Sequence, residues 1–309
     1  MNFTPHNPRV AIIILNWNNW SDTRECVESL SKIRYPAYEV IIVDNGSIDD
    51  STKNLAAWCR THTNTCLICL SENKGFSAGT NAGIAYALEK GYSCFWLLNN
   101  DTVVDQNALT GLVKAIQSGS SIGIAGSLLL DYRHPDTIQN AGVGSFFLRL
   151  RTLRNTEKKG LRGNHQNNRH CAWLWAASIL IKSECLKDIG FLDEKYFYTT
   201  EDADLCLRAH RKNWGCILAF ESRVWHKAGF LRKDKDFLKR RLYYEIRNEI
   251  YFYRRYLPHY LLGAIFCNAG LLVKSFFASH RGLLSCSMIL QAIRDGWLMR
   301  MGKISYDAI

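Results

Sequence analysis

The amino-acid sequence predicts an α/β fold with a mostly parallel central sheet, flanked by helices and followed by a C-terminal helical extension. Short continuous apolar runs, typical of strands buried on both faces, alternate with helical segments through the first hundred residues. Polar or glycine-rich segments follow several of these runs, at the strand ends where such sheets bind ligands. Beyond residue 230 the pattern changes to basic amphipathic and apolar stretches.

The predicted elements of the first hundred residues alternate regularly. Strands are expected at residues 10–15, 38–43, 65–70 and 94–98, and helices at residues 21–30 and 51–60. Ser21 is expected to cap the first helix. A glycine-rich turn at residues 73–83 opens a third helix, which runs to Lys90.

The middle of the chain is predicted to add irregular β structure and two more helices. Residues 131–147 are interpreted as a β excursion with a turn at residues 134–136. Residues 149–170 carry seven Lys or Arg and one acidic residue without a hydrophobic period, which predicts an exposed, mobile loop. Apolar stretches are seen at residues 173–181 and 216–224, and helices are expected at residues 183–189 and 200–212.

The positive charge is concentrated at the C-terminal end. The chain has a formal net charge of +11, and residues 223–303 contain sixteen Lys or Arg and five Asp or Glu, so they hold the whole excess. This excess predicts contact with an anionic surface. We favour membrane lipid over nucleic acid, because apolar segments accompany the charge and no helix-turn-helix, zinc finger or aromatic RNA platform is recognisable.

We expect a catalytic domain at residues 1–230 and a basic amphipathic helical region at residues 231–309. Residues 237–256 have a helical hydrophobic period, and residues 260–273 form an apolar stretch of only fourteen residues. Such a stretch is too short to span a bilayer, so peripheral attachment is predicted. The competing expectation is a helical cap packed on the catalytic domain or on a dimer partner, which leaves a homo-oligomer open.

Several function classes are disfavoured by the sequence. The glycines of the 73–83 turn match neither the dinucleotide-binding nor the P-loop spacing, so close helix packing and a nucleotide role stay equally open for them. Cys66 and Cys69 are predicted to point to opposite faces of a strand, which disfavours zinc. The chain opens without a secretory signal, and its eleven cysteines show no disulfide framework, which indicates reduced thiols in the cytosol.

Four residues in particular carry candidate chemistry. Asp44 and Asp101 follow predicted strands, Asp202 begins a predicted helix, and His226 follows an apolar stretch. A carboxylate and an imidazole can hold a divalent cation, and a second carboxylate can take a proton. Taken singly, each has a structural alternative, since Asp44 could cap its own turn, Asp202 could complement a helix dipole, and His226 could be an ordinary half-buried histidine.

The order of these segments resembles the family 2 inverting glycosyltransferases, in particular bacterial rhamnosyltransferase-like members that build surface polysaccharides. The matching segments are residues 10–18, 40–47, 73–81, 97–102, 190–194, 201–208, 224–229 and 247–248. The resemblance implies the nucleotide-diphospho-sugar transferase fold known as GT-A. It is specific for the fold and the reaction class, and it leaves the sugar, the acceptor and the linkage open.

The resemblance also implies roles for individual residues. Asp101 would bind the metal ion, Mg²⁺ or Mn²⁺, together with His226, and Asp202 would be the catalytic base beside Glu201. Asn99 stands where many members have a further acid, and its neutral carbonyl oxygen is a weaker ligand for a hard cation. The residues implied to contact the nucleoside and diphosphate are Asn16, Asp44, Lys74, Gly75, Asn81 and Asn100.

The implied function is metal-dependent, inverting transfer of a hexosyl or rhamnosyl group from a dTDP- or UDP-linked sugar to a hydroxyl of a glycan or lipid-linked acceptor. The site of action would be the cytoplasmic face of the cell membrane. Two alternatives stay open. A sugar nucleotidyltransferase would share the sheet, but it would more usually need a basic glycine-rich loop, which residues 10–20 lack. A non-catalytic scaffold that binds nucleotide sugars also stays open, because Asn99 replaces an acid found in many members of the family.

Overall fold

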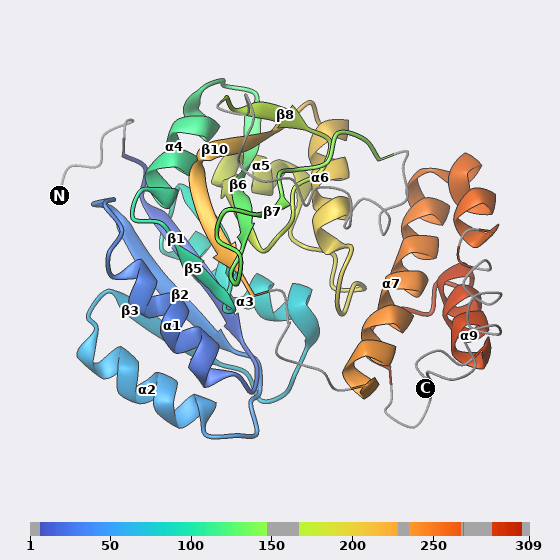
Figure 1. Cartoon of the computed structure of the whole chain (residues 1–309), viewed down its shortest axis with the longest axis horizontal. Helices are drawn as coiled ribbons and strands as arrows, with labels where there is room; N and C mark the ends of the chain where they lie inside the picture. Colours follow the sequence, from blue (N-terminus) through green and yellow to red (C-terminus); the bar gives the residue numbers. More distant parts are fainter. Residues whose placement is uncertain (1–6, 147–166, 228–234, 267, 269–285, 305–309) are drawn as a thin grey trace.

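The first half of the molecule is the predicted regular alternation of strands and helices (Figure 1). The computed structural model describes residues 7–146, 167–227, 235–266, 268 and 286–304. Its first elements are β1 (Val10–Asn16), α1 (Trp20–Leu30), β2 (Tyr38–Asp44), α2 (Ser51–Thr61), β3 (Thr65–Cys69), α3 (Gly75–Glu89) and β4 (Cys94–Asn99). These four strands are mutually parallel in the order β3-β2-β1-β4. The ends of β2, β1 and β4 therefore meet at one edge of the sheet.

The start of α1 differs from the prediction. Asn19, rather than Ser21, occupies the capping position, and Ser21 lies in the first turn. The Asn19 side chain donates a hydrogen bond to Asp22 Oδ2 at 2.7 Å. Asn and Ser are about equally favoured as helix caps, so residue type alone could not separate the two positions.

The glycine-rich segment after β3 is mostly helix rather than turn. Helix α3 begins at Gly75, inside the predicted turn. A Cβ atom on Gly79 would lie 2.5 Å from Leu15 Cδ1, and one on Gly83 would lie 2.7 Å from Ile13 Cγ2. These two glycines therefore let α3 pack closely on β1, which is the packing role that the sequence left open.

The second half of the molecule is less regular. Its elements are β5 (Thr102–Val104), α4 (Ala108–Gln117), β6 (Ile122–Asp131), β7 (Ile138–Asn140), β8 (Arg169–Cys171), β9 (Ser178–Lys182), α5 (Ser183–Ile189), α6 (Glu201–Arg211) and β10 (Gly215–His226). The β excursion after β6 and helices α5 and α6 match the predictions. The predicted loop at residues 149–170 ends earlier, because Arg169 and His170 pair with β10 as part of β8. Residues 149–166 of that loop lie outside the described residues.

The ten described strands form one mixed sheet, in the order β3-β2-β1-β4-β9-β6-β10-β5, with β7 beside β6 and β8 beside β10. β9 is antiparallel to β4 and β6, and β5, β7 and β8 are antiparallel to their partners. The expected mostly parallel arrangement therefore holds for β1 to β4 and for the β6–β10 pair only. Only β7 follows its antiparallel partner, β6, after a short connection. The antiparallel strands β5, β8 and β9 pair with strands that lie far from them in the sequence, so connection length does not set their direction.

The core lies on both faces of the sheet. Ile12 and Ile14 of β1 pack into a cluster with residues of α1 and α4, whereas Ile13 packs into a second cluster with residues of α3, α5 and α6. Successive side chains of a strand point to opposite faces. A strand covered by helices on both faces must therefore be apolar at every position, which is why the apolar runs were readable in the sequence.

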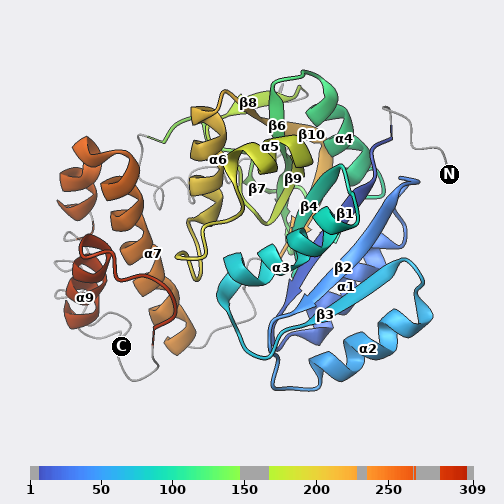
Figure 2. The ribbon, with the colours of Figure 1, turned by 180° about the vertical axis from the view of Figure 1, so that it is seen from behind.

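The C-terminal helices pack on the sheet domain and on one another. They include α7 (Lys235–Tyr256), a 3₁₀ turn (Pro258–Tyr260), a helical segment at residues 261–266, and α9 (Cys286–Trp297). Both views place α7 between the sheet domain and α9 (Figures 1 and 2). Ile250 and Tyr253 of α7 lie in the same core cluster as α3 and α6. The apolar face of α7 therefore covers the sheet domain, as the cap alternative predicts. A domain boundary at residue 230 stays a prediction.

Candidate active site

A chain of buried hydrogen bonds joins the ends of β2, β1 and β4. Asn16 Nδ2 donates to Asp44 Oδ1 at 2.8 Å, and Asn16 Oδ1 accepts from Thr23 Oγ1 at 2.7 Å. Asn100 Nδ2 donates to the same Thr23 hydroxyl at 2.9 Å. Three of the residues predicted to contact the donor, Asn16, Asp44 and Asn100, are therefore held together. Thr23, in the first turns of α1, links two of them and was not singled out by the sequence.

Asp44 also organises the loop that follows β2. Its carboxylate accepts hydrogen bonds from Ser47 Oγ at 2.6 Å and from Thr52 Oγ1 at 2.7 Å. The turn-capping role that the sequence left open for Asp44 is therefore present. This bonding fixes the loop at the strand ends, while contact between Asp44 and a nucleoside stays a prediction.

Two asparagine side chains fix the segment that begins α3, one from the segment itself and one from the loop after β2. Asn45 Oδ1 accepts from the Lys74 backbone N–H at 3.0 Å, and Asn73 Oδ1 accepts from the Gly75 N–H at 2.9 Å. Gly75 has φ +89°, and a Cβ there would lie 2.6 Å from Phe197 O. The position thus requires glycine for both its conformation and its close approach. The Lys74 side chain is exposed.

Asn81, a predicted donor contact, is bonded within the protein. Its Nδ2 donates to Leu192 O at 2.9 Å and to Glu194 Oε1 at 3.0 Å, and its Oδ1 accepts from the Leu192 N–H at 3.2 Å. These contacts anchor the segment between α5 and α6 to α3. The structure thus gives Asn81 a structural role at a buried position.

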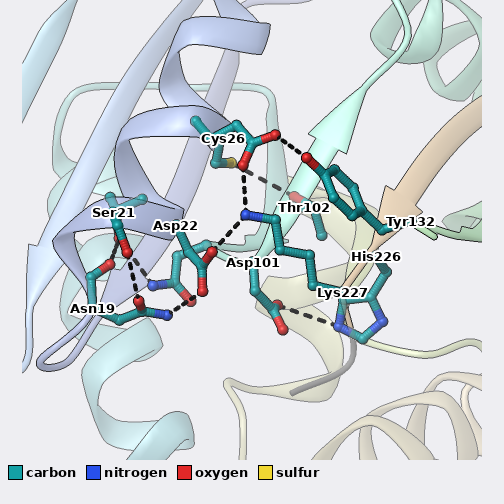
Figure 3. Close-up of polar contacts among 12 residues, drawn as sticks. Asn19, Ser21, Asp22, Cys26, Asp101, Thr102, Tyr132, His226 and Lys227 are labelled. Carbon is teal, nitrogen blue, oxygen red and sulfur yellow. Dashed lines mark hydrogen bonds and ion pairs between the residues drawn. The ribbon is translucent and has the colours of Figure 1, made fainter. Parts of the chain in front are cut away.

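Asp101 and His226 face each other beside the first residue of β5 (Figure 3). Asp101 lies in the turn between β4 and β5, and His226 ends β10, where it pairs with Thr102 of β5. The distance from Asp101 Oδ1 to His226 Nε2 is 3.3 Å. The two residues that the sequence assigned to the metal are therefore brought together. Asn99 Nδ2 lies 3.5 Å from the same His226 nitrogen.

Gln139 of β7 orients the imidazole of His226. Gln139 Nε2 donates to His226 O at 3.3 Å, which turns Gln139 Oε1 toward His226 Nδ1 at 2.6 Å. An amide oxygen only accepts hydrogen bonds, so Nδ1 carries the proton and Nε2 of a neutral ring presents its lone pair to Asp101. This is the arrangement of a metal-binding histidine with an outer-shell partner. No sequence pattern had pointed to Gln139.

The Asp101–His226 pair fits a divalent cation as part of a site. A carboxylate oxygen and an imidazole nitrogen facing each other need a positive charge between them, which either a proton or a metal ion supplies. Among the described residues no group of three or more His, Cys, Asp or Glu could hold a metal ion. The pair would therefore need further ligands from a bound molecule or from water.

Lys227 ties the end of β10 to α1. Its Nζ lies 2.5 Å from Asp22 Oδ1 and 2.5 Å from Glu25 Oε2, and its backbone N–H donates to Asp101 O at 2.9 Å (Figure 3). Tyr132 Oη donates to Glu25 Oε1 at 2.5 Å. Burial opposes the charge of Lys227, but the hydrogen bonds to Asp22 and Glu25 outweigh burial and raise its pKa. Lys227 lay inside a segment that matched the family, yet its partners could not be read from the sequence.

Asp202 is held at the start of α6. Its Oδ2 accepts from the Ala176 N–H at 3.2 Å and its Oδ1 accepts from the Ala203 N–H at 2.8 Å. Ala177 O in turn accepts from the Asn99 N–H at 3.0 Å. The segment at residues 176–177 therefore links Asp202 to the strand end beside Asp101. Asp202 and its neighbour Glu201 are both buried.

A comparison with protein families matches residues 11–182 to "Glycosyl transferase family 2". The chain belongs to this family. The match covers more than half of the chain and ends before α6, so Asp202, His226 and α7 all lie beyond it.

Individual relatives are similar to the chain at low identity. The low-salt glycan biosynthesis hexosyltransferase Agl10 of Haloferax volcanii is 25% identical over 66% of this chain and 62% of its own length. The N-acetylglucosaminyl-diphospho-decaprenol L-rhamnosyltransferase of Mycobacterium tuberculosis is 23% identical over 70% of this chain and 75% of its own length. This chain thus spans less than two thirds of the length of Agl10.

Solved structures confirm the predicted GT-A fold. The mannosyltransferase PcManGT of Pyrobaculum calidifontis, in complex with GDP-Man and Mn²⁺, superposes with a TM-score of 0.62 at 14% identity and covers 95% of this chain and 88% of its own. GalNAc-T7 with UDP, GalNAc and Mn²⁺ superposes with a TM-score of 0.60 at 16% identity, over 72% of this chain and 44% of its own.

Proposed function

We propose that this protein is a metal-dependent inverting glycosyltransferase that moves a sugar from a nucleotide-diphosphate sugar to a hydroxyl of a glycan acceptor. The observation that carries the proposal is the Asp101–His226 pair, whose facing atoms lie 3.3 Å apart at the edge where three strand ends meet. Family membership and the GT-A fold support the reaction class.

Asp101 and His226 would hold the Mg²⁺ or Mn²⁺ ion. Such an ion neutralises the negative charge that develops on a diphosphate leaving group. Asn99 contributes an amide where an additional acid would strengthen hard-cation binding. We therefore expect weak metal affinity in the free protein and stronger affinity once the diphosphate adds its own oxygens.

Asp202 would act as the general base. Its carboxylate is oriented by the Ala176 and Ala203 N–H groups, which fixes where it can accept a proton. The acceptor hydroxyl would lose its proton to Asp202 as its oxygen attacks the anomeric carbon and the nucleoside diphosphate leaves. A single displacement of this kind inverts the anomeric configuration.

The family resemblance and the name of one relative support the donor and acceptor classes that we propose. We propose a dTDP- or UDP-linked hexose or rhamnose as donor and a lipid-linked glycan as acceptor, in the synthesis of a surface polysaccharide. The name of the mycobacterial relative includes both a diphospho-decaprenol and rhamnosyl transfer, which supports this choice.

The test is a panel of dTDP-, UDP- and GDP-sugars incubated with the full chain, with Mn²⁺, with Mg²⁺ or with EDTA. We expect release of nucleoside diphosphate from one donor class, abolished by EDTA, and inverted configuration in the product by NMR. Exchange of pyrophosphate into the sugar nucleotide would instead identify a nucleotidyltransferase. Binding of the sugar nucleotide without any turnover would identify a scaffold.

We also propose peripheral attachment to the cytoplasmic face of the membrane through the C-terminal helices. No helix in the described residues is long and apolar enough to cross a bilayer. Leu262 and Phe266 are 66% and 74% exposed, and α9 and the residues after it expose Leu290, Trp297, Leu298 and Met299. Arg294 and Arg300 add positive charge to this end of the chain, and both also pair with Asp295, at 3.4 and 3.8 Å. Exposed apolar side chains accompanied by positive charge are suited to an anionic lipid surface.

The structure changes which residues should insert into the membrane. Within the apolar stretch at residues 260–273, the sequence predicts membrane burial of Leu261, Leu262, Ile265, Phe266, Leu271 and Leu272. Leu261 is instead buried in the protein core, in the same cluster as Ile250 of α7. Ile265 is partly buried against the same cluster, whereas Leu262 and Phe266 stay exposed. The remaining two, Leu271 and Leu272, lie outside the described residues.

Vesicle flotation tests the attachment. The full chain should float with anionic vesicles at low salt, and Leu262→Glu with Phe266→Glu should reduce flotation. Ile48→Glu is the control, because Ile48 is an apolar residue in the loop after β2 and is 91% exposed, more than either Leu262 or Phe266. Flotation that is equal for all three proteins, or absent for the full chain, would exclude this surface.

A further inference from the structure

Two residues directly before the proposed base adopt an unusual backbone conformation. Thr199 and Thr200 have φ +66° and +74°, and α6 with Glu201 and Asp202 begins at the next residue. The left-handed region is strongly disfavoured for β-branched residues. Such a conformation persists only where the surrounding structure holds it, and it is often found at functional sites.

The side chain that holds this turn comes from α7. Asn248 Nδ2 donates to Tyr198 O at 2.7 Å and to Thr199 O at 3.0 Å. Asn248 Oδ1 accepts from Arg247 Nε at 3.1 Å, and Arg247 Nη1 donates to Gly302 O at 2.8 Å. The guanidinium thus fixes the Asn248 amide so that its two N–H groups face the turn. Asn248 is fully buried.

The opposite side of the same segment is held by α3. Ser77 Oγ donates to Tyr196 O at 2.8 Å, and the Phe76 N–H donates to Phe197 O at 2.8 Å. Four successive carbonyl groups, from residue 196 to residue 199, are therefore bonded by the two flanking helices, the first two by α3 and the last two by α7. The chain enters α6 from a backbone that is restrained on both sides.

We propose that Asn248 is a positioning residue that sets the place of the Asp202 carboxylate through the turn at Thr199 and Thr200. The inference rests on the proposed function, since it needs Asp202 to be the base, and it gives α7 a part in catalysis that is separate from membrane attachment. Asn248 touches no substrate. It holds the two carbonyl groups that fix the left-handed turn, and this turn directs the first residues of α6 toward Ala176.

Replacement of Asn248 should separate turnover from binding. Asn248→Ala should lower kcat by ~10- to 100-fold, because small misplacements of a catalytic group have costs of this size. The KM for the nucleotide sugar and the calorimetric affinity for the nucleoside diphosphate should stay within about twofold, since the strand-end residues are untouched. Asn248→Asp, which places an acceptor against two carbonyls, should lose at least as much. If the alanine variant fails to fold, Asn248→Ser is a milder substitution that tests the same prediction.

A second substitution tests the route through the turn. Glycine adopts a positive φ without strain, so Thr200→Gly should restore part of the kcat lost in Asn248→Ala. Asn213→Gly in the same background is the matched control, because Asn213 also has a positive φ, of +62°, but follows the far end of α6. It should raise stability without restoring kcat.

The outcomes distinguish this proposal from the proposed function. Wild-type kcat in a folded Asn248→Ala or Asn248→Ser protein overturns the positioning role. Equal recovery of kcat by both glycine substitutions overturns it as well, because a general gain in stability would then explain the effect. Wild-type turnover in Asp202→Asn would remove the base assignment itself, whatever the Asn248 variants do.

Discussion

The two halves of the site are held together in different ways. In the donor half, Asn16 bonds Thr23 seven residues away and Asp44 bonds Ser47 three residues away. Longer bonds join these local groups, from Asn16 to Asp44 across 28 residues and from Asn100 to Thr23 across 77 residues. In the catalytic half, His226 bonds Gln139 across 87 residues and Lys227 bonds Asp22 across 205 residues. The donor half therefore combines local groups at the ends of the parallel strands, whereas the bonds of His226 and Lys227 form only once β10 has joined the sheet.

The largest effect is expected at the base. Asp202→Asn should lower turnover by ~10²–10⁴-fold, as general-base removal typically does, while nucleotide-sugar binding stays nearly unchanged. Steady-state kinetics and calorimetry on the same preparation measure the two quantities. Near-normal kinetics in a well-folded Asp202→Asn protein would show that the catalytic half is organised around a different residue.

The next effect concerns the metal pair and its partner. Asp101→Ala and His226→Ala should both weaken metal-dependent binding of UDP or dTDP. Gln139→Leu should raise the Mn²⁺ concentration for half-maximal binding by ~10- to 100-fold, because outer-shell partners of metal-bound histidines have effects of this size. Calorimetry with and without Mn²⁺ measures all three. An unchanged Mn²⁺ response in both the Asp101→Ala and His226→Ala proteins would place the metal elsewhere.

The third prediction compares the stability contributed by the long-range ion pairs of Lys227 with that of an exposed surface ion pair. Lys227→Met leaves Asp22 and Glu25 without their cation, and should lower the free energy of unfolding by up to about 3 kcal/mol. Lys114→Met is the matched control, because Lys114 forms an exposed ion pair with Glu221 at 3.2 Å and should cost less than about 1 kcal/mol. Urea unfolding compares them. An equal loss of unfolding free energy in the two variants would mean that the ion pairs between β10 and α1 contribute no more than an exposed ion pair.

The smallest expected effect is the pH dependence of the stability that the Lys227–Glu25 ion pair contributes. Burial alone would raise the pKa of Glu25, but the hydrogen bonds from Lys227 and Tyr132 outweigh burial and lower it. The stabilisation is therefore present above the ordinary glutamate pKa and is lost as the pH falls through the lowered value. The stability difference between wild type and Lys227→Met should be constant near neutral pH and shrink below about pH 4. A difference that grows on acidification would contradict this sign.

Much of the fold could be predicted because its signals are local. The strands β1 to β4 were readable as continuous apolar runs, since both faces of the sheet are covered by helices. The candidate residues Asp44, Asp101 and Asp202 were readable because they stand where a strand ends or a helix begins. The family resemblance assigned Asn16, Asp44 and Asn100 to one site, and parallel strands bring such strand ends to one edge.

Other features depended on which strands become neighbours. The sheet is mixed because β9 pairs antiparallel with both β4 and β6. The hydrophobic pattern of the sequence does not indicate which strands will be the neighbours of β9. The same holds for Gln139, which reaches His226 only because β7 pairs with β6 beside β10.

The sequence by itself determined the family, the order of the elements and the residues at the strand ends, because apolar periodicity and chain breaks act over a few residues. The tertiary structure decided how α7 is used. The sequence favoured a membrane surface for its apolar positions and gave a packed cap as the alternative, and only the packed molecule shows Ile250 and Tyr253 inside the core. It also decided that Asn248 meets the turn before Asp202, since two segments fifty residues apart come together only through the packing of α7 against α3 and α6.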